Sequence, residues 1–277
     1  MNVTFRITFL LLYCALFCSF LDRGETAVSI CSWNLLDFGK SKSDAEIDFI
    51  ANTIKDYDIV LIQEVVAKDP GGAQAVGRLG EALNRKGSKW DYRISDPTSG
   101  ENSYKRERYA YLWKPSKATL VGKPWLEKQF SNEIDREPFY ATFISASLKF
   151  TLVNFHAITK SKQPETEVKY FKFLPEEYPD LNLIFCGDFN LPQSHTVFNP
   201  LKKMGYLPAL TGQKTSLRQE CINNDCLASE FDNIYYNSHK INNVSSGVVH
   251  FYRSFGNLND ARKISDHVPV YFRFSAK

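Results

Sequence analysis

Polar side chains suited to metal binding and proton transfer stand at the ends of apolar segments in this 277-residue chain. The apolar residues 183–186, for example, lead directly into Gly187, Asp188, Phe189 and Asn190. Five other strand-like segments begin or end with such residues, namely Asn34, Glu64, His156, Asp232, and Asp266 with His267. Turns favour Asp and Asn for conformational reasons alone, so no single position is decisive. Their recurrence at six strand ends predicts one shared site.

These residue types match metal-assisted cleavage of a phosphate ester. Carboxylate and amide oxygens are hard ligands that suit Mg²⁺, with Mn²⁺ and Ca²⁺ as alternatives. Two histidines can serve as base and acid near neutral pH, and each needs an acidic partner to fix its tautomer. The sequence contains neither a P-loop nor a serine nucleophile elbow, which argues against an NTPase and an acyl hydrolase.

Strand-like and helix-like segments along the chain predict an α/β fold with sheets inside and helices outside. Strand-like runs, rich in Val, Ile, Phe and Tyr, occupy residues 28–33, 58–63, 109–113, 139–150, 151–156, 181–186, 231–236 and 267–274. Helices are predicted over residues 43–57, 73–84, 166–174 and 194–205. The first begins with a capping box formed by Ser43 and Glu46. The absence of a linker-like stretch in the sequence predicts one domain.

The first 27 residues differ from the rest of the chain. Arg6 precedes an apolar run over residues 7–21, and polar residues follow. This pattern is typical of a secretory signal peptide and is short for a membrane span, although an uncleaved anchor and a core helix are the alternatives. We therefore expect a signal peptide at 1–27, a mature domain at 28–277, and a secreted or periplasmic protein. The net charge of +3 neither requires nor opposes a nucleic-acid partner.

The cysteines outside the leader fall into two pairs of different character. Cys31 and Cys186 lie inside apolar runs and are expected to be small buried hydrophobic side chains. Cys221 and Cys226 lie in a polar segment, where an exported protein favours a small disulfide. A zinc site is the alternative for that pair, but no CxxC pair or nearby histidine supports it.

The ordered motifs of the chain resemble those of the endonuclease/exonuclease/phosphatase superfamily, and in particular its deoxyribonuclease I-like branch. They are SWNLLDFG, LIQEV, GENSYKRERYAYLW, REPFYATF, NFHA, GDFN, FDNI and SDHVPV, spread over most of residues 28–274. QEV, GDFN and SDH indicate the superfamily, whereas NSYKRERY and REP favour the branch over its sphingomyelinase and inositol-phosphatase relatives. The resemblance implies a four-layer sandwich of two mixed β-sheets packed face to face, with helices on the outer faces.

The resemblance also implies a set of metal-site residues. Glu64 is similar to the principal metal ligand of such proteins, with Asn34 beside it. Asp266 resembles a further acid of the metal site. Asp188 and Asn190 resemble the pair that positions the attacking water, the phosphate and a second metal. The implied cofactor is Mg²⁺ or Mn²⁺, with Ca²⁺ as a further candidate.

Two imidazole–carboxylate pairs are implied in the same way. His267, oriented by Asp232, resembles the general base that takes a proton from water. His156, paired with Glu107, resembles the general acid that protonates the leaving O3′. Together these four residues would carry the proton transfers of phosphodiester hydrolysis.

Substrate contacts are implied at Tyr104, which resembles a residue that stacks on a sugar, and at Arg136 of the REP motif, which resembles a phosphate ligand in the minor groove. One position departs from the family pattern. Val66 follows the QEV motif where the resembling nucleases carry an arginine that contacts DNA. We expect this departure to weaken or shift the preference for duplex DNA.

The function implied by the resemblance is a secreted, monomeric, metal-dependent endonuclease that cleaves DNA with little sequence specificity and associates with no membrane. A phosphodiesterase of the same fold acting on a phospholipid such as sphingomyelin is the first alternative. It requires an exposed apolar hairpin, for which residues 123–130 are a weak candidate. A catalytically weak DNA-binding relative is the second, and the intact set of acids and histidines argues against it.

Overall fold

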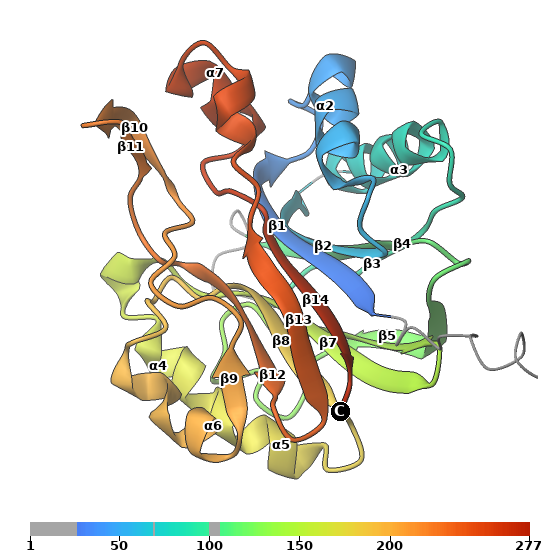
Figure 1. Ribbon diagram of the computed structural model, residues 1–277, viewed down its shortest axis with the longest axis vertical. Coiled ribbons are helices and arrows are strands. Elements are labelled where there is room, and N and C mark those ends of the chain that lie inside the picture. Colours follow the sequence, from blue (N-terminus) through green and yellow to red (C-terminus); the bar gives the residue numbers. More distant parts are fainter. Residues whose placement is uncertain (1–26, 69, 100–105) are drawn as a thin grey trace, which may run out of the picture.

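The structure is a computed structural model that describes residues 27–68, 70–99 and 106–277. The leader predicted at 1–27, except for Ala27, and the predicted sugar contact Tyr104 therefore lie outside the described residues. The described residues form two six-stranded mixed sheets and one two-stranded sheet. The resulting architecture is the expected four-layer sandwich (Figure 1).

Each six-stranded sheet has one parallel pair of strands at its centre and antiparallel strands around it. The first sheet contains, in spatial order, β13 (Ile241–Val248), β14 (Val270–Ala276), β1 (Val28–Phe38), β2 (Ile59–Val66), β4 (Glu107–Trp113) and β3 (Asp91–Ile94). The second contains β5 (Thr119–Leu126), β6 (Phe139–Ser145), β7 (Leu148–His156), β8 (Leu183–Asp188), β12 (Asp232–Asn237) and β9 (Tyr206–Pro208). The parallel pairs are β1 with β2 and β7 with β8.

Helices cover the outer face of each sheet (Figure 1). The first sheet is covered by α2 (Asp44–Ile54), α3 (Gly71–Asn84), α7 (Leu258–Ile264) and the 3₁₀ turn η6 (Phe251–Ser254). The second is covered by η3 (Lys160–Lys162), α4 (Glu165–Val168), η4 (Lys169–Phe173), α5 (Leu174–Glu177), η5 (Thr196–Phe198) and α6 (Asn199–Lys203). A hairpin of β10 (Leu217–Ile222) and β11 (Asp225–Leu227) stands apart and carries the expected Cys221–Cys226 disulfide.

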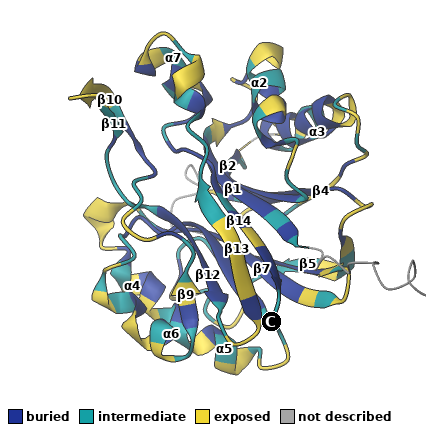
Figure 2. Cartoon of the chain, in the orientation of Figure 1, coloured by how far each residue is buried: buried dark blue, intermediate teal, exposed yellow. Residues whose placement is uncertain are grey.

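Alternation of side chains along each strand explains why both sheets are covered on both faces. In β2, Ile59 and Leu61 pack between the sheets, whereas Val60 and Ile62 face the helices. In β8, Ile184 and Cys186 pack between the sheets, and Leu183 and Phe185 face the other helical layer. Because both faces of these strands are covered, the central strands are mostly dark blue in Figure 2, while the outer faces of the helices are exposed.

The structure corrects some of the predicted boundaries. The predicted strand over residues 139–150 is two strands, because the chain turns through Ala146 (φ 51°) between β6 and β7. No glycine, proline or asparagine marks this turn in the sequence. The predicted helix at 166–174 is a series of short α and 3₁₀ segments, with Pro175 near the start of the last one. The capping box of Ser43 and Glu46 is present at α2.

Candidate active site

The ends of β7 and β8 and the start of β12 bring three predicted residues side by side. His156 is in register with Asp188, and Asp188 is in register with Asp232. Because β8 runs parallel to β7 and antiparallel to β12, two strand ends and one strand start meet at the same edge. All three side chains are buried. The sheet therefore fixes these groups before any ligand is bound.

A glycine and a left-handed asparagine form the turn that presents Asp188. Gly187 has a φ of 138°, and a Cβ at this position would lie 1.9 Å from the Phe155 carbonyl oxygen, so a larger residue is excluded. Asn190 has a φ of 52°. Its backbone N–H donates to Asp188 Oδ1 (2.9 Å), and its Nδ2 donates to the Ala157 carbonyl oxygen (3.1 Å). The GDFN motif thus acts as a rigid mount for two polar side chains.

Glu64 reaches the cleft through an irregularity in the first sheet. The register of β2 shifts around it against both β1 and β4, and its φ of 59° lies in the left-handed region. Bulges of this kind redirect a side chain beside an active site. Glu64 Oε1 accepts a hydrogen bond from Asn34 Nδ2 (2.9 Å), and Oε2 accepts one from the Asp37 N–H (3.0 Å).

Asn34 links the carboxylates of the two sheets. Its Nδ2 donates to Asp188 Oδ2 (3.3 Å) as well as to Glu64, while its Oδ1 accepts a hydrogen bond from the Leu36 N–H (3.1 Å). In this orientation Asn34 presents a donor to the cleft and holds two acids together. Metal ligation through Asn34 Oδ1, as predicted from the sequence, requires the amide to turn.

Two histidines approach the same Asp188 oxygen, and each has a carboxylate at its Nδ1. His156 Nδ1 lies 2.9 Å from Glu107 Oε1, and His267 Nδ1 lies 2.7 Å from Asp232 Oδ2. The Nε2 atoms of His156 and His267 lie 3.5 and 3.6 Å from the same Asp188 Oδ2. Both pairings expected from the sequence are therefore present in one cleft.

The loop that carries His267 is held by residues that sequence reasoning missed. Ser265 Oγ accepts a hydrogen bond from the His267 N–H (2.9 Å) and donates to the Asn34 carbonyl oxygen (2.5 Å). Trp33 Nε1 donates to the His267 carbonyl oxygen (2.7 Å), and the Phe231 ring stacks on the imidazole. Ser265 opens the SDHVPV motif and Trp33 precedes Asn34, so their places beside motif residues were the available signal.

Charge crowding shifts the pKa values of the buried groups. Burial lowers the pKa of His267, but Asp232 and Asp188 raise it more, so the net pKa is well above the usual value. Burial and Arg136 lower the pKa of His156, and Glu107 and Asp188 outweigh them, so its net pKa is also raised. Burial raises the pKa of Asp188, but the two histidines lower it further, so the net pKa is below the usual value. The cleft thus favours an ionised Asp188 between two imidazolium rings.

A depression of about 360 Å³ opens beside Glu107 and Glu64. It is lined by Asp37, Glu64, Val66, Lys68, Arg106, Glu107 and Arg136. Arg136 donates through Nη2 to the Ala157 carbonyl oxygen, and its Nε lies 3.5 Å from Glu107 Oε1. Val66, the departure from the family pattern, therefore shares its depression with three cationic side chains.

Asp266 lies next to an arginine, Arg262, rather than next to a histidine partner like those of Asp232 and Glu107. Its carboxylate lies 3.4 Å from Arg262 Nη2 and shares a depression of about 630 Å³ with His267 and Phe231. Asp266 lies beside His267 and has no hydrogen bond to Glu64 among the described residues, so its predicted place in a metal site stays a prediction.

The donor set fits a hard divalent cation. Ligand atoms of Asp188, Asp232 and His267 all lie within 4.8 Å of one another, and Asn34 holds the Glu64 and Asp188 carboxylates together. Oxygen-rich sites of this kind suit Mg²⁺, Mn²⁺ or Ca²⁺. Crowded carboxylates repel one another unless a positive charge offsets them. The residues present are therefore compatible with the cofactors expected from the sequence.

Acids and imidazoles gathered at the strand ends of two mixed sheets suit metal-assisted hydrolysis of phosphate esters. The model of the endonuclease/exonuclease/phosphatase family matches residues 31–267, and the chain belongs to that family. Within the family it falls in the deoxyribonuclease I-like branch. Curated relatives named deoxyribonuclease gamma match 90–92% of this chain, and one named deoxyribonuclease-1 matches 61% of it.

Curated relatives and solved structures agree with this assignment. Deoxyribonuclease gamma from Mus musculus is 30% identical over 90% of this chain and 85% of its own length. A deoxyribonuclease from Thioalkalivibrio sp. (strain K90mix) is 26% identical over 88% and 70%. Among solved structures, an endonuclease/exonuclease/phosphatase family protein from Bacteroides thetaiotaomicron has a TM-score of 0.66 at 18% identity, covering 90% of this chain and 97% of that one, which supports the fold alone.

Proposed function

We propose that this chain is a secreted, divalent-metal-dependent endonuclease that hydrolyses phosphodiester bonds in DNA with little sequence specificity. The observation that carries the proposal is the pair of imidazole–carboxylate dyads that both face Asp188, with Nε2 distances of 3.5 and 3.6 Å. One in-line displacement needs a base on the side of the attacking water and an acid on the side of the leaving oxygen. Two dyads at one anionic centre meet that need.

The two histidines take opposite roles in this proposal. His267, oriented by Asp232, takes a proton from the attacking water through Nε2. His156, oriented by Glu107, gives a proton from Nε2 to the leaving O3′. Each carboxylate fixes the tautomer of its histidine and stabilises the charged ring. Asp188 and Asn190 position the water and the phosphate between the two rings.

Glu64 and Asp188 would hold the metal ion, with Asn34 orienting their carboxylates and Asp266 as a further acid nearby. A bound Mg²⁺ or Mn²⁺ supplies charge stabilisation for the phosphorane-like transition state and lowers the pKa of coordinated water. Ca²⁺ is a further candidate on the basis of oxygen ligands alone. Asp188 is buried and Glu64 partly exposed, so an ion bound between them would remain within reach of a phosphate in the cleft.

DNA is the substrate that the family branch favours. Arg136, Arg106 and Lys68 line the depression that contains Glu64, and Tyr104 lies in the neighbouring segment outside the described residues. Contacts of cationic side chains to backbone phosphates carry no direct sequence information, which accounts for the low specificity proposed here. We place Arg136 and Tyr104 along the minor groove, where negative potential attracts arginine.

Secretion and a monomeric state are part of the proposal. The apolar leader and the Cys221–Cys226 disulfide both suit an oxidising compartment. Among the described residues, no helix is long and apolar enough to cross a membrane. Mass spectrometry of the exported protein, read for a mature N-terminus near residue 28, tests the leader directly.

The test of the substrate class is a comparison of three phosphodiesters. Supercoiled plasmid, sphingomyelin in mixed micelles and bis(p-nitrophenyl) phosphate are each incubated with the mature protein and Mg²⁺, Mn²⁺ or Ca²⁺. We expect plasmid nicking and slow cleavage of the chromogenic ester. Asp188→Asn is expected to abolish both, whereas Asp225→Asn, on the β10–β11 hairpin, is the matched control. Sphingomyelin turnover without plasmid nicking would replace the proposal by its phospholipid alternative.

A further inference from the structure

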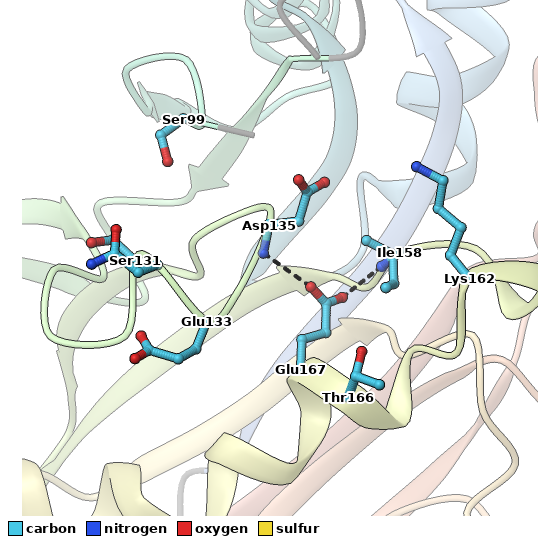
Figure 3. A pocket seen from close by; sticks show the side chains of 9 residues that line it. Ser99, Ser131, Glu133, Asp135, Ile158, Lys162, Thr166 and Glu167 are labelled. Atoms are coloured by element: carbon cyan, nitrogen blue, oxygen red, sulfur yellow. Dashed lines mark hydrogen bonds between the residues drawn. The ribbon is translucent and has the colours of Figure 1, made fainter. Parts of the chain in front are cut away.

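A buried carboxylate outside the active site joins two loops that carry active-site residues. Glu167 belongs to the short helix α4 and is 2% exposed. Its Oε2 accepts a hydrogen bond from the Asp135 N–H (3.0 Å), and its Oε1 accepts one from the Ile158 N–H (2.6 Å). Figure 3 shows the side chain reaching between the two segments, with one oxygen directed at each.

Each bridged segment is adjacent to a group of the site. Asp135 precedes Arg136, and Ile158 follows Ala157 and His156. The Ala157 carbonyl oxygen accepts hydrogen bonds from Arg136 Nη2 and from Asn190 Nδ2. The bridge through Glu167 therefore fixes the spacing between the segment that carries the Arg136 guanidinium and the carbonyl that receives it.

Packing contributes little to this spacing on the solvent side. An open depression of about 460 Å³ lies beside the bridge, lined by residues of both segments (Figure 3). Ile134 and Ala157, which precede Asp135 and Ile158, belong to one buried hydrophobic cluster. The two hydrogen bonds of Glu167 therefore act together with core contacts in setting the separation of the loops. Two backbone N–H donors directed at one carboxylate form charge-assisted hydrogen bonds, which are stronger than neutral ones.

Burial of the Glu167 carboxylate has a cost that its partners offset in part. Burial raises the pKa of Glu167, and the N–H groups of Ile158 and Asp135 and the Arg136 guanidinium lower it by less, so the net pKa is raised. The ionised form is therefore less favourable here than in water. The two hydrogen bonds of Glu167 both satisfy the Asp135 and Ile158 N–H groups and hold the two segments at a defined separation.

We propose that Glu167 is a positioning residue for phosphodiester hydrolysis, which acts by holding Arg136 against the Ala157 carbonyl at the mouth of the Glu64–Glu107 depression. The inference rests on the proposed function, because Arg136 is the group that binds the phosphate. A glutamine at position 167 keeps one acceptor and turns an NH₂ group towards a backbone N–H. One of the two loops is then released, and the guanidinium loses its fixed orientation.

A double-mutant cycle with Arg136 tests the proposal. Glu167→Gln, Arg136→Ala and the double variant are compared in steady-state cleavage of a duplex oligonucleotide with Mg²⁺. We expect Glu167→Gln to lower kcat/KM about tenfold, mainly through KM, since a coupling of about 1.4 kcal/mol is a factor of ten. The double variant is expected to be no slower than Arg136→Ala alone. Losses that multiply would overturn the proposal, because Glu167 would then act independently of Arg136.

Asp58→Asn is the matched control for loss of a carboxylate that accepts backbone hydrogen bonds. Asp58 accepts from the Ser29 N–H (2.9 Å) and precedes β2, at the opposite end of that strand from Glu64. We expect this variant to lower the melting temperature and to leave kcat/KM of the folded protein unchanged. An equal loss of kcat/KM in Asp58→Asn and Glu167→Gln would show a general effect of destabilisation and would contradict a positioning role.

Two further arms separate this inference from the proposed function. Glu167→Asp keeps the charge but shortens the side chain by one methylene, so we expect a partial loss of kcat/KM. This variant also serves as the test if Glu167→Gln does not fold. If the wild-type protein cleaves another phosphodiester and not DNA, the proposed function is wrong. The double-mutant cycle of positions 167 and 136 can then still be measured on that other substrate. Coupling between positions 167 and 136 on either substrate supports the inference, and its absence on both sinks it.

Discussion

The two imidazole–carboxylate pairs of the cleft have the same geometry and different electrostatic surroundings. His267 faces two acids, Asp232 and Asp188, which hold its pKa well above the usual value. His156 faces Glu107 and Asp188, but the Arg136 guanidinium opposes them and limits the rise of its pKa. The Arg136 guanidinium thus opposes the charged form of His156, which suits the proposed role of this ring as a general acid.

The same difference bears on the proposed role of His267 as the general base. A general base must be neutral at the working pH, yet in the metal-free protein the two carboxylates favour the charged form of His267. A positive charge near Asp188 would lower the pKa of His267 towards neutrality. The comparison therefore predicts that metal binding and base function are linked on one side of the cleft.

The largest expected effect on the rate of DNA cleavage follows the removal of either imidazole. His156→Ala and His267→Ala should each lower the rate of DNA cleavage by about 10²–10⁴, since general acid–base groups contribute this much. Bis(p-nitrophenyl) phosphate separates the two roles, because its leaving group needs no proton. His156→Ala should therefore retain most activity on this ester, whereas His267→Ala should not.

Exposed His239, in the loop that follows β12, supplies the control for these variants. His239→Ala is expected to leave both activities unchanged. Equal losses for His156→Ala on DNA and on the chromogenic ester would contradict its assignment as the acid.

The next effect concerns the carboxylates behind the rings. Glu107→Gln and Asp232→Asn should each lower the rate of DNA cleavage by about 10–100-fold, because an amide no longer fixes the tautomer or stabilises the charged ring. Initial rates at saturating Mg²⁺ measure this loss, with Asp225→Asn as the control. If Asp232→Asn had wild-type rates across the pH range, orientation of His267 by Asp232 would be ruled out as a catalytic requirement.

The pH dependence of the free energy of unfolding should report the raised histidine pKa values in metal-free protein. The folded-state pKa values of both histidines are raised above the unfolded value of about 6.5. Their contribution to the free energy of unfolding is therefore fully present below about pH 6.5 and is lost as pH rises through the folded-state pKa. Urea unfolding in EDTA should show that His267→Gln costs more stability at about pH 6 than at alkaline pH. A cost that grows with pH would instead indicate that the folded-state pKa of His267 is lowered.

The smallest expected effect is a change in one histidine pKa that makes the pKa values of His156 and His267 more alike. Arg136→Ala removes the cation that lowers the pKa of His156, so the pKa of His156 should rise while that of His267 stays unchanged. Imidazole titration by NMR in metal-free protein measures both rings in one experiment. An unchanged His156 would mean that Arg136 does not account for the difference between the pairs.

Local sequence patterns were sufficient for the central strands of both sheets and for the polar residues at their ends. Consecutive apolar residues in strands such as β2 and β8 predicted two covered faces. Parallel pairing of β7 with β8 places His156 beside Asp188, and Asn34 links Glu64 of the other sheet to Asp188. The capping box of Ser43 and Glu46 predicted the start of α2. These features depend on neighbours in the sequence, which is why they could be predicted without coordinates.

Features that depend on distant contacts could not be predicted in this way. Ala146 adopts a left-handed conformation because β6 and β7 pair with each other, not because of its own preference. β13 and α7 were missed because their apolar residues are few or widely spaced. Glu167 looks in sequence like an ordinary exposed helical residue, and only the approach of Asp135 and Ile158 gives it partners.

Metal dependence tests the central claim most directly, because every role assigned to the cleft assumes a divalent cation among its acids. The rate of supercoiled plasmid nicking is measured for metal-stripped protein while Mg²⁺ is added, and again with Glu64→Gln. We expect no nicking in excess EDTA, recovery on addition of Mg²⁺, and a large loss of that recovery in Glu64→Gln. Undiminished nicking in excess EDTA would contradict the account.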